Sequence, residues 1–176
     1  PARRRRRMSR SLTDLLPVLG LRVTAGPLEL RGITDDVLAD LCGLAERGIH
    51  DPDQMPFYFP WTDAPADELA RNTAQYHWRC RADFSPAAWD LHLATYVDGT
   101  LVGTQGFSTS DYLVTRSGET GSWLGREHQG RGIGSVLLEH LAAIGREPGV
   151  RLFTADVLPQ NRKMINVFQD AGYEVT

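Results

Sequence analysis

The feature that most constrains this chain is a run of spaced glycines between a strand-like segment and a helix-like segment. Residues 119–125 are half apolar, as in a strand with one buried face, and Gly130, Gly132 and Gly134 follow them. Apolar residues then recur at helical spacing, at Ile133, Val136, Leu137, Leu141 and Ile144. Glycines let backbone N–H groups converge on one point, and a helix N-terminus adds about half a positive charge there. The sequence therefore predicts a site for an anion, most often a phosphate.

Two common phosphate loops do not fit this spacing. A Walker loop requires Gly-Lys-Ser/Thr, but the only lysine of the chain is Lys163. A dinucleotide loop requires G-x-G-x-x-G, and after Gly130 and Gly132 the third position is Ser135. Asp156 lies roughly where a ribose-binding acid would stand, but too little chain follows for a doubly wound sheet. Another phosphate ligand, or a glycine-rich turn without a ligand, remains open at this point.

Two segments together resemble one known family. Gln129-x-x-Gly132-x-Gly134 is similar to the Q/R-x-x-G-x-G/A pyrophosphate loop of the GNAT superfamily of acyl-CoA-dependent N-acyltransferases. Residues 161–173 resemble that family's N-x-x-A-x-x-L-Y-x-K-x-G-F segment, in the same order and at a matching separation. The L-x-L-R of residues 28–31 and the E-x-G-x-W-L of residues 119–124 are similar to ribosomal-protein N-terminal acetyltransferases. The chain after Gly134 resembles bacterial protein-lysine acetyltransferases, so the acceptor stays open.

The resemblance implies an α/β (α+β) fold: a mixed central sheet with antiparallel N-terminal strands, flanking helices and a V-shaped splay between two strands. The family would add a last strand after Tyr173, where only three residues follow. We therefore expect the C-terminal strand to be missing or truncated, which would leave a sheet edge open to a homodimer partner. Local patterns predict a hairpin over 21–33, helices from Thr34 and Pro65, strands over 91–97 and 101–107, a second hairpin over 112–116 and 119–125, a strand over 151–158 and a helix over 161–171.

The family's co-substrate would be acetyl-CoA, bound in three ways. Backbone N–H groups from Gln129 to Ser135 would hold the pyrophosphate, backbone groups of residues 123–125 would pair with the pantetheine arm, and Asn161 would reach that arm from the last helix. The implied cofactor-binding residues are Trp123, Leu124, Gly125, Gln129, Gly130, Arg131, Gly132, Ile133, Gly134, Ser135 and Asn161.

Acetyl transfer to an amine also needs a base and a proton for the leaving thiolate. Glu119 matches the acid of the family's E-x-G-x-W-L strand and is our candidate base, directly or through water, with a solvated strand-edge carboxylate as the alternative. Ser122, on the opposite face of the strand, is a second candidate. Phe168 stands where the family has a proton-donating tyrosine. Water or Tyr173 would replace that donor, or the thiolate, with a pKa of about 8.5, would leave as the anion.

Composition bounds the remaining possibilities. The 176 residues predict one domain over 11–176, after an Arg-rich and disordered tail over 1–10 in which Met8 is a candidate start. A net charge of -3 gives no general attraction to nucleic acid, and no apolar run approaches the length of a membrane span. Cys42 and Cys80 each fall in a predicted helix, which favours free thiols and the cytoplasm.

The sequence leaves two functional hypotheses. The first is an enzyme that transfers an acetyl group from acetyl-CoA to a primary amine by direct attack in a ternary complex; the acceptor would be a protein N-terminus, a lysine or a small molecule. The second is an acyl-CoA-binding module without turnover, which Phe168 and the missing strand favour. No metal is predicted, because His77 and Cys80 lie three apart on one helix face but no second pair accompanies them.

Overall fold

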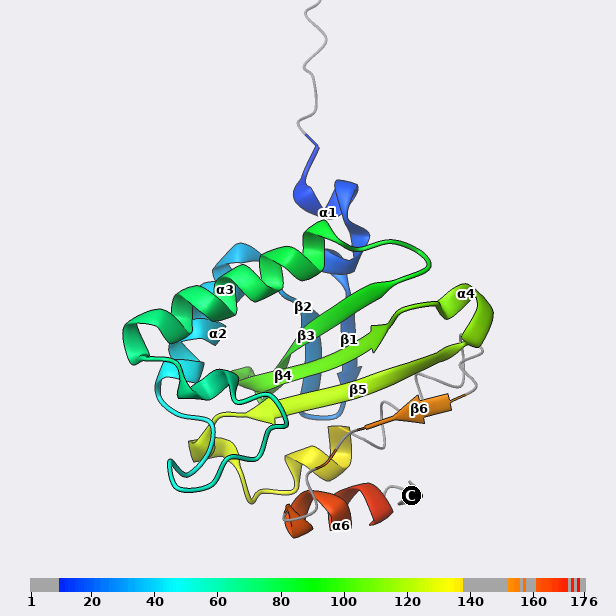
Figure 1. Ribbon diagram of the computed structural model, residues 1–176. Coiled ribbons are helices and arrows are strands. Elements are labelled where there is room, and N and C mark those ends of the chain that lie inside the picture. The colour runs from blue at the N-terminus through cyan, green and yellow to red at the C-terminus, as the bar shows by residue number, and fades with distance from the viewer. Residues whose placement is uncertain are drawn as a thin grey trace, which may run out of the picture.

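The computed structural model describes residues 10–137, 152–155, 157, 161–170, 172 and 174, and these residues form a six-stranded sheet flanked by helices (Figure 1). The strands lie in the order in which they occur in the chain; the first five pair antiparallel, and the last pair is parallel. The mixed sheet confirms the predicted fold class. The strands are β1 (Arg22–Ala25), β2 (Leu28–Gly32), β3 (Trp89–Val97), β4 (Thr100–Thr109), β5 (Ser117–Leu124) and β6 (Leu152–Thr154).

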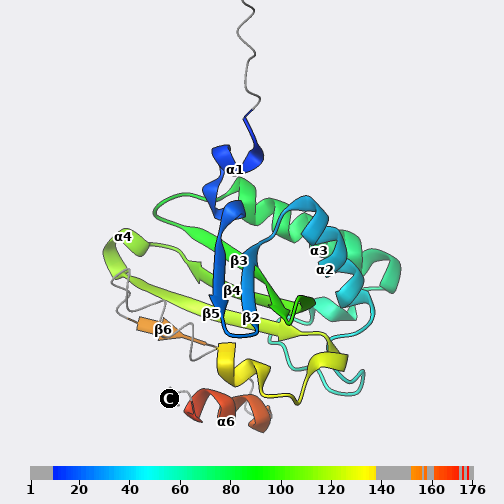
Figure 2. The ribbon, with the colours of Figure 1, turned by 180° about the vertical axis from the view of Figure 1, so that it is seen from behind.

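The two long helices, α2 (Asp35–Glu46) and α3 (Ala66–Ala82), pack on one face of the sheet. The helix that begins at Ile133 packs on the other face, with α6 (Arg162–Asp170) beside it in both views (Figures 1 and 2). The shorter elements are α1 (Leu12–Leu15), η1 (Pro17–Gly20), η2 (Trp61–Asp63), α4 (Tyr112–Thr115) and η3 (Arg126–His128).

Alternating burial along β2 separates two apolar cores. Leu28 and Leu30 point to one face and pack with Leu137 below the helix that begins at Ile133. On the other face, apolar residues of α2 pack against β3; this cluster contains Ile33, Leu38, Leu41, Cys42, Ala94 and Tyr96. Helices therefore pack on both faces of the sheet, so the edge of the sheet is a firmly held surface for a ligand.

Most predicted turns and helix starts are confirmed. Gly26 lies in the turn of the β1–β2 hairpin, and α2 follows Thr34 directly. The turn between β3 and β4 has positive φ at both Asp98 (48°) and Gly99 (77°), as a two-residue hairpin turn of type I′ requires. Cys42 and Cys80 are free thiols in α2 and α3. Within the described part of the chain, no helix combines the length and apolar character that crossing a bilayer demands.

The predicted strand over residues 112–116 is wrong. Tyr112–Thr115 form the helical turn α4, and Arg116 closes it in the left-handed region with a φ of 52°. The N–H groups of Thr115 and Arg116 donate to carbonyls four residues earlier, at 2.9 and 3.0 Å. Leu113 and Val114 suggested a strand, but both are exposed, so no sheet face buries them. The antiparallel partner of β5 is β4, which continues to Thr109.

Several expectations lie outside the described residues. These are the disordered tail as far as residue 9, including Met8, and the positions of Tyr173 and Val175 in the expected last strand. Of the predicted 151–158 strand, Leu152–Thr154 is β6, while residues 151, 156 and 158 are not described.

Candidate active site

The site begins where β5 and β6 stop pairing. The two parallel strands are in register from Ser117↔Leu152 to Glu119↔Thr154 (Figure 1). Beyond that pair, the described residues give no strand partner to residues 121–124 on this side. In the described part of the chain, this edge of β5 is therefore open after Glu119, where the pairing with β6 ends.

The open edge presents backbone donors. The N–H of Gly125 donates to the carbonyl oxygen of Val102 at 2.9 Å, toward β4. Successive residues of a strand direct their backbone groups to opposite edges. The N–H groups of Leu124 and Ser122 therefore point to the open edge, where an extended ligand could pair with them as a neighbouring strand would.

The glycine loop forms an open cradle at the end of β5. Gly130 and Gly132 have φ of 75° and 77°, a region that side chains rarely adopt. No described atom lies within 4 Å of a Cβ atom built at Gly130, Gly132 or Gly134. A helix begins at Ile133, and its first turns pack on the sheet. The loop thus joins unobstructed backbone to a fixed helix N-terminus, which is the arrangement that binds phosphate.

Gln129 holds this loop in place with its side chain. Its Nε2 atom donates to the carbonyl oxygens of Ile49 at 2.5 Å and Leu124 at 2.9 Å, and its own N–H donates to Arg126 at 3.3 Å. The N–H of Arg126 in turn donates to the carbonyl oxygen of Gly48 at 3.0 Å. Gln129 therefore ties the loop to the end of α2, and the N–H groups that remain for a phosphate begin at Gly130.

The two hydrogen bonds of the Gln129 side chain, called the Gln129 clamp below, give a testable expectation for Gln129→Met. This change keeps the length of the side chain but removes its donors. Two carbonyl oxygens would lose their partner, so we expect acetyl-CoA affinity to fall about tenfold and residues 125–135 to become more sensitive to protease. Calorimetry and limited proteolysis measure these effects. Gln75→Met, at an exposed position of α3, is the matched control. Equal affinities for the two variants would contradict the role of the Gln129 clamp.

A cleft of about 680 Å³ lies on the α3 side of Glu119. Strand register places Asp90, Ser108, Glu119 and Thr154 in one row across β3, β4, β5 and β6, and all four line this cleft. The wall comes from α3, through Tyr76, Arg79, Cys80 and Asp83, and from the α4 region, through Thr115 and Ser117. Glu119 thus faces a volume large enough for a small acceptor, beside the open edge of β5.

The next row of the sheet is His92, Gly106 and Gly121. The ring of His92 lies on Gly106, where a Cβ atom would stand 2.7 Å from its Cε1 atom. Over Gly121, by contrast, no described atom lies within 4 Å of a built Cβ. The described residues therefore leave open space between Glu119 and Trp123 on this face of β5.

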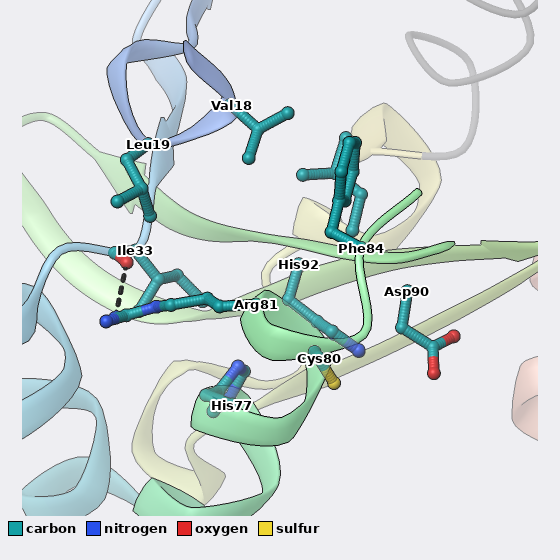
Figure 3. A pocket seen from close by; sticks show the side chains of 10 residues that line it. Val18, Leu19, Ile33, His77, Cys80, Arg81, Phe84, Asp90 and His92 are labelled. Atoms are coloured by element: carbon teal, nitrogen blue, oxygen red, sulfur yellow. Dashed lines mark hydrogen bonds between the residues drawn. The ribbon is translucent and has the colours of Figure 1, made fainter. Parts of the chain in front are cut away.

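Two histidines, His77 and His92, line a small cavity of about 30 Å³ that shares Cys80 and Asp90 with the cleft (Figure 3). The hydroxyl of Tyr76 is hydrogen-bonded to Nε2 of His92 at 2.9 Å, and the ring of His77 meets that of His92 edge-on at 5.1 Å between centroids. Burial lowers the pKa of His77 to about 3 and also lowers that of His92. Both rings are therefore neutral at pH 7. No group of three metal-binding side chains gathers in the described residues, and His77 and Cys80 line the cavity instead.

The neutral histidines predict a pH dependence of stability. Above pH 6.5 both rings are neutral in the folded and the unfolded chain. Below it, the unfolded chain takes up protons first, so the free energy of unfolding falls as the pH drops from 6.5 toward 3, by about 1.4 kcal/mol per unit for His77. Urea unfolding at pH 7 and pH 5 measures the loss. His77→Phe should reduce it, and an unchanged loss in this variant would contradict the assignment.

The other predicted residues lie around this site in different roles. The side chain of Ser122 faces away from Glu119, opposite the buried Gln105. The ring of Trp123 lies 5.9 Å from that of Trp61, so the loop before α3 is anchored on the site. The Oδ1 atom of Asn161 accepts from the N–H of Met164 at 3.2 Å and caps α6.

Four residues of the site, Tyr76, Asp90, Ser108 and His92, are not predicted from the sequence. The period of two in β3 places Asp90 and His92 on the face opposite Leu91 and Leu93, and it says nothing of Tyr76 in α3 or Ser108 in β4. Nothing local indicates that this face meets α3, because that contact joins residues far apart in the chain.

Comparison with known proteins agrees with this geometry. Residues 48–173 match the sequence model of the acetyltransferase (GNAT) family. The GNAT domain of S. lividans PAT is 31% identical, with a TM-score of 0.63 over 88% of this chain and 87% of that chain. RimL, a ribosomal L7/L12 alpha-N-protein acetyltransferase solved with coenzyme A, is 16% identical, with a TM-score of 0.69 over 89% of this chain and 85% of that chain. Microcin C7 self-immunity acetyltransferase MccE, solved with acetyl-CoA and AMP, is also 16% identical, with a TM-score of 0.64 over 84% of this chain and 79% of that chain.

The family match extends over most of the chain and includes both the glycine loop and the segment that begins at Asn161. The predicted resemblance is therefore confirmed. This chain belongs to the GNAT family of acetyltransferases.

Proposed function

We propose that the protein transfers an acetyl group from acetyl-CoA to a primary amine by direct attack in a ternary complex. The observation that carries the proposal is the position of Glu119, which lies where the pairing of β5 with β6 ends and lines the cleft beside it. A single residue thus borders both the edge on which a thioester would lie and the space for an acceptor. Named relatives support the class, since RimL is an alpha-N-protein acetyltransferase and another structural neighbour is a spermidine N-acetyltransferase.

Acetyl-CoA would bind along β5 and the loop after it. The N–H groups from Gly130 to Ser135 would hold the pyrophosphate, and Arg131 would add charge, although its guanidinium now donates to the carbonyl oxygen of Glu127 at 3.0 Å. The pantetheine arm would take the place of a strand along residues 122–124. Because Oδ1 of Asn161 caps α6, its Nδ2 atom is the group that would reach this arm.

The reaction would then proceed in three proton-balanced steps. Glu119 removes a proton from the acceptor ammonium, directly or through water, and the amine nitrogen attacks the thioester carbon. The N–H of Ser122 or Leu124 stabilises the oxyanion that forms. The carbon–sulfur bond breaks, the nitrogen gives its second proton to water, and water returns a proton to the thiolate. The amide and the thiol are then released, and Glu119 returns its proton to the solvent.

The second hypothesis, an acyl-CoA-binding module without turnover, is favoured by one residue. Phe168 is 8% exposed and packs with Ala155, Val157, Met164 and Val167. A phenyl ring among apolar neighbours supplies no proton to a thiolate, so turnover would use water or Tyr173 for that step, or release the thiolate as the anion.

A thiol-release assay separates the two hypotheses. Acetyl-CoA would be presented with a panel of amines that includes N-terminal peptides, lysine peptides, aminoglycosides and polyamines. We expect thiol release only when an acceptor is present. Binding of acetyl-CoA without release for any member of the panel would instead support the binding module.

A further inference from the structure

The floor of the cleft carries a second carboxylate, Asp90, two strands away from Glu119 in the same row. Asp90 pairs with Ser108, and Ser108 pairs with Glu119, so the two acids lie on the same face with β4 between them. Neighbouring strands are about 4.8 Å apart, which separates the two acids by about 10 Å at their Cα atoms. Ser108 places a hydroxyl between them, and all three residues line the cleft.

The charge of the cleft favours a cationic occupant. Among the described residues that line it are three acids, Asp83, Asp90 and Glu119, and one base, Arg79. The histidines behind the wall add no positive charge at pH 7, because burial lowers the pKa of both. An acceptor with more than one ammonium group therefore meets a net negative surface.

An aromatic ring completes the Asp90 end of this cleft. Tyr76 is 41% exposed, and its ring is oriented by the hydrogen bond between its hydroxyl and Nε2 of His92. Asp90 is close enough to Tyr76 to contribute to the raised pKa of its phenol, after the larger effect of burial. An aromatic face beside a carboxylate attracts an ammonium group from two sides.

We propose that Asp90 is a specificity-determining residue, which holds a second cationic group of the acceptor while the reacting amine lies at Glu119. The substrate class is an amine with another positive charge at a distance that the row from Asp90 to Glu119 accommodates. An alkane diamine is its simplest member. The inference rests on the proposed acetyl transfer for the role of Glu119, but the binding of the second charge is measurable without turnover.

Calorimetry on the CoA-saturated protein tests this with two matched ligands. Cadaverine and pentylamine have the same carbon chain and differ only in the second amine. We expect cadaverine to bind about tenfold more tightly than pentylamine, and Asp90→Asn to remove this advantage while pentylamine binding stays the same. Asp98→Asn, the same change in the turn after the other end of β3, should leave both affinities as in the parent. Equal binding of the two amines, or unchanged cadaverine binding in Asp90→Asn, would overturn the proposal.

Kinetics then separate this inference from the function on which it rests. In the thiol-release assay, Asp90→Asn should raise the KM for cadaverine about tenfold and leave its kcat within about twofold. If no amine releases thiol but cadaverine binding depends on Asp90, the acetyl transfer fails and the second-charge site stands. If both amines release thiol with KM values that Asp90→Asn leaves unchanged, the acetyl transfer stands and the assignment of Asp90 is wrong.

Discussion

Gly132→Asp and Gly134→Glu are each expected to abolish acetyl-CoA binding. A carboxylate at either position would enter the space that the cradle now leaves open, where no described atom lies within 4 Å of a built Cβ. It would meet the pyrophosphate as a like charge in the place where the helix N-terminus attracts an anion. Isothermal calorimetry with acetyl-CoA measures the loss, which should be at least about a hundredfold in affinity.

The matched control for these variants is Gly26→Asp. Gly26 has a φ of 57°, so an aspartate there meets the same left-handed backbone as at Gly132, but in the β1–β2 turn at the far edge of the sheet. It should bind acetyl-CoA as the parent does. If Gly132→Asp and Gly134→Glu also bind like the parent, the glycine loop is not the phosphate site. NADH and ATP should compete poorly with acetyl-CoA in the same experiment.

Glu119→Gln is expected to lower kcat about a hundredfold or more, because an amide cannot take the proton of the acceptor. The acid limb of the rate profile should flatten, since the group whose ionisation that limb reports is gone. Acetyl-CoA affinity should barely change, because Glu119 points to the cleft and not to the cradle. Steady-state kinetics across pH, together with calorimetry, measure the two effects separately. An equal fall in acetyl-CoA binding and in turnover would identify a structural carboxylate.

The order of elements was accessible from the sequence because its signals are local. Asp98-Gly99 supplies both positive φ angles of a tight turn, and the alternation of residues 91–97 defines a strand within a few residues. The glycine loop was predicted for the same reason. The predicted strand over residues 112–116 is wrong because the apolar side chains of Leu113 and Val114 fit either a strand or a helical turn. Only the fold decides whether a sheet face is present to bury them.

The parts of the site that the sequence did not predict depend on distant contacts. The side chain of Gln129 finds its partner at Ile49, 80 residues away, so a motif that names Gln129 does not reveal that it binds protein. The row from Asp90 to Glu119 requires the register of three strands and the position of α3 above them. Tyr76 and His92, 16 residues apart, meet only because β3 returns beneath α3.

Gly106 of β4 and Gly121 of β5 are paired, and both lack a side chain on the face toward α3. At position 106 the ring of His92 already fills the space of the missing side chain, so a methyl group there would collide with that ring, which is hydrogen-bonded to Tyr76. At position 121 no atom of the described residues lies within 4 Å of a built Cβ atom. A methyl group on Gly121 would therefore meet no atom of the described residues, and under the proposed acetyl transfer it would limit the size of the acyl group that fits beside Glu119.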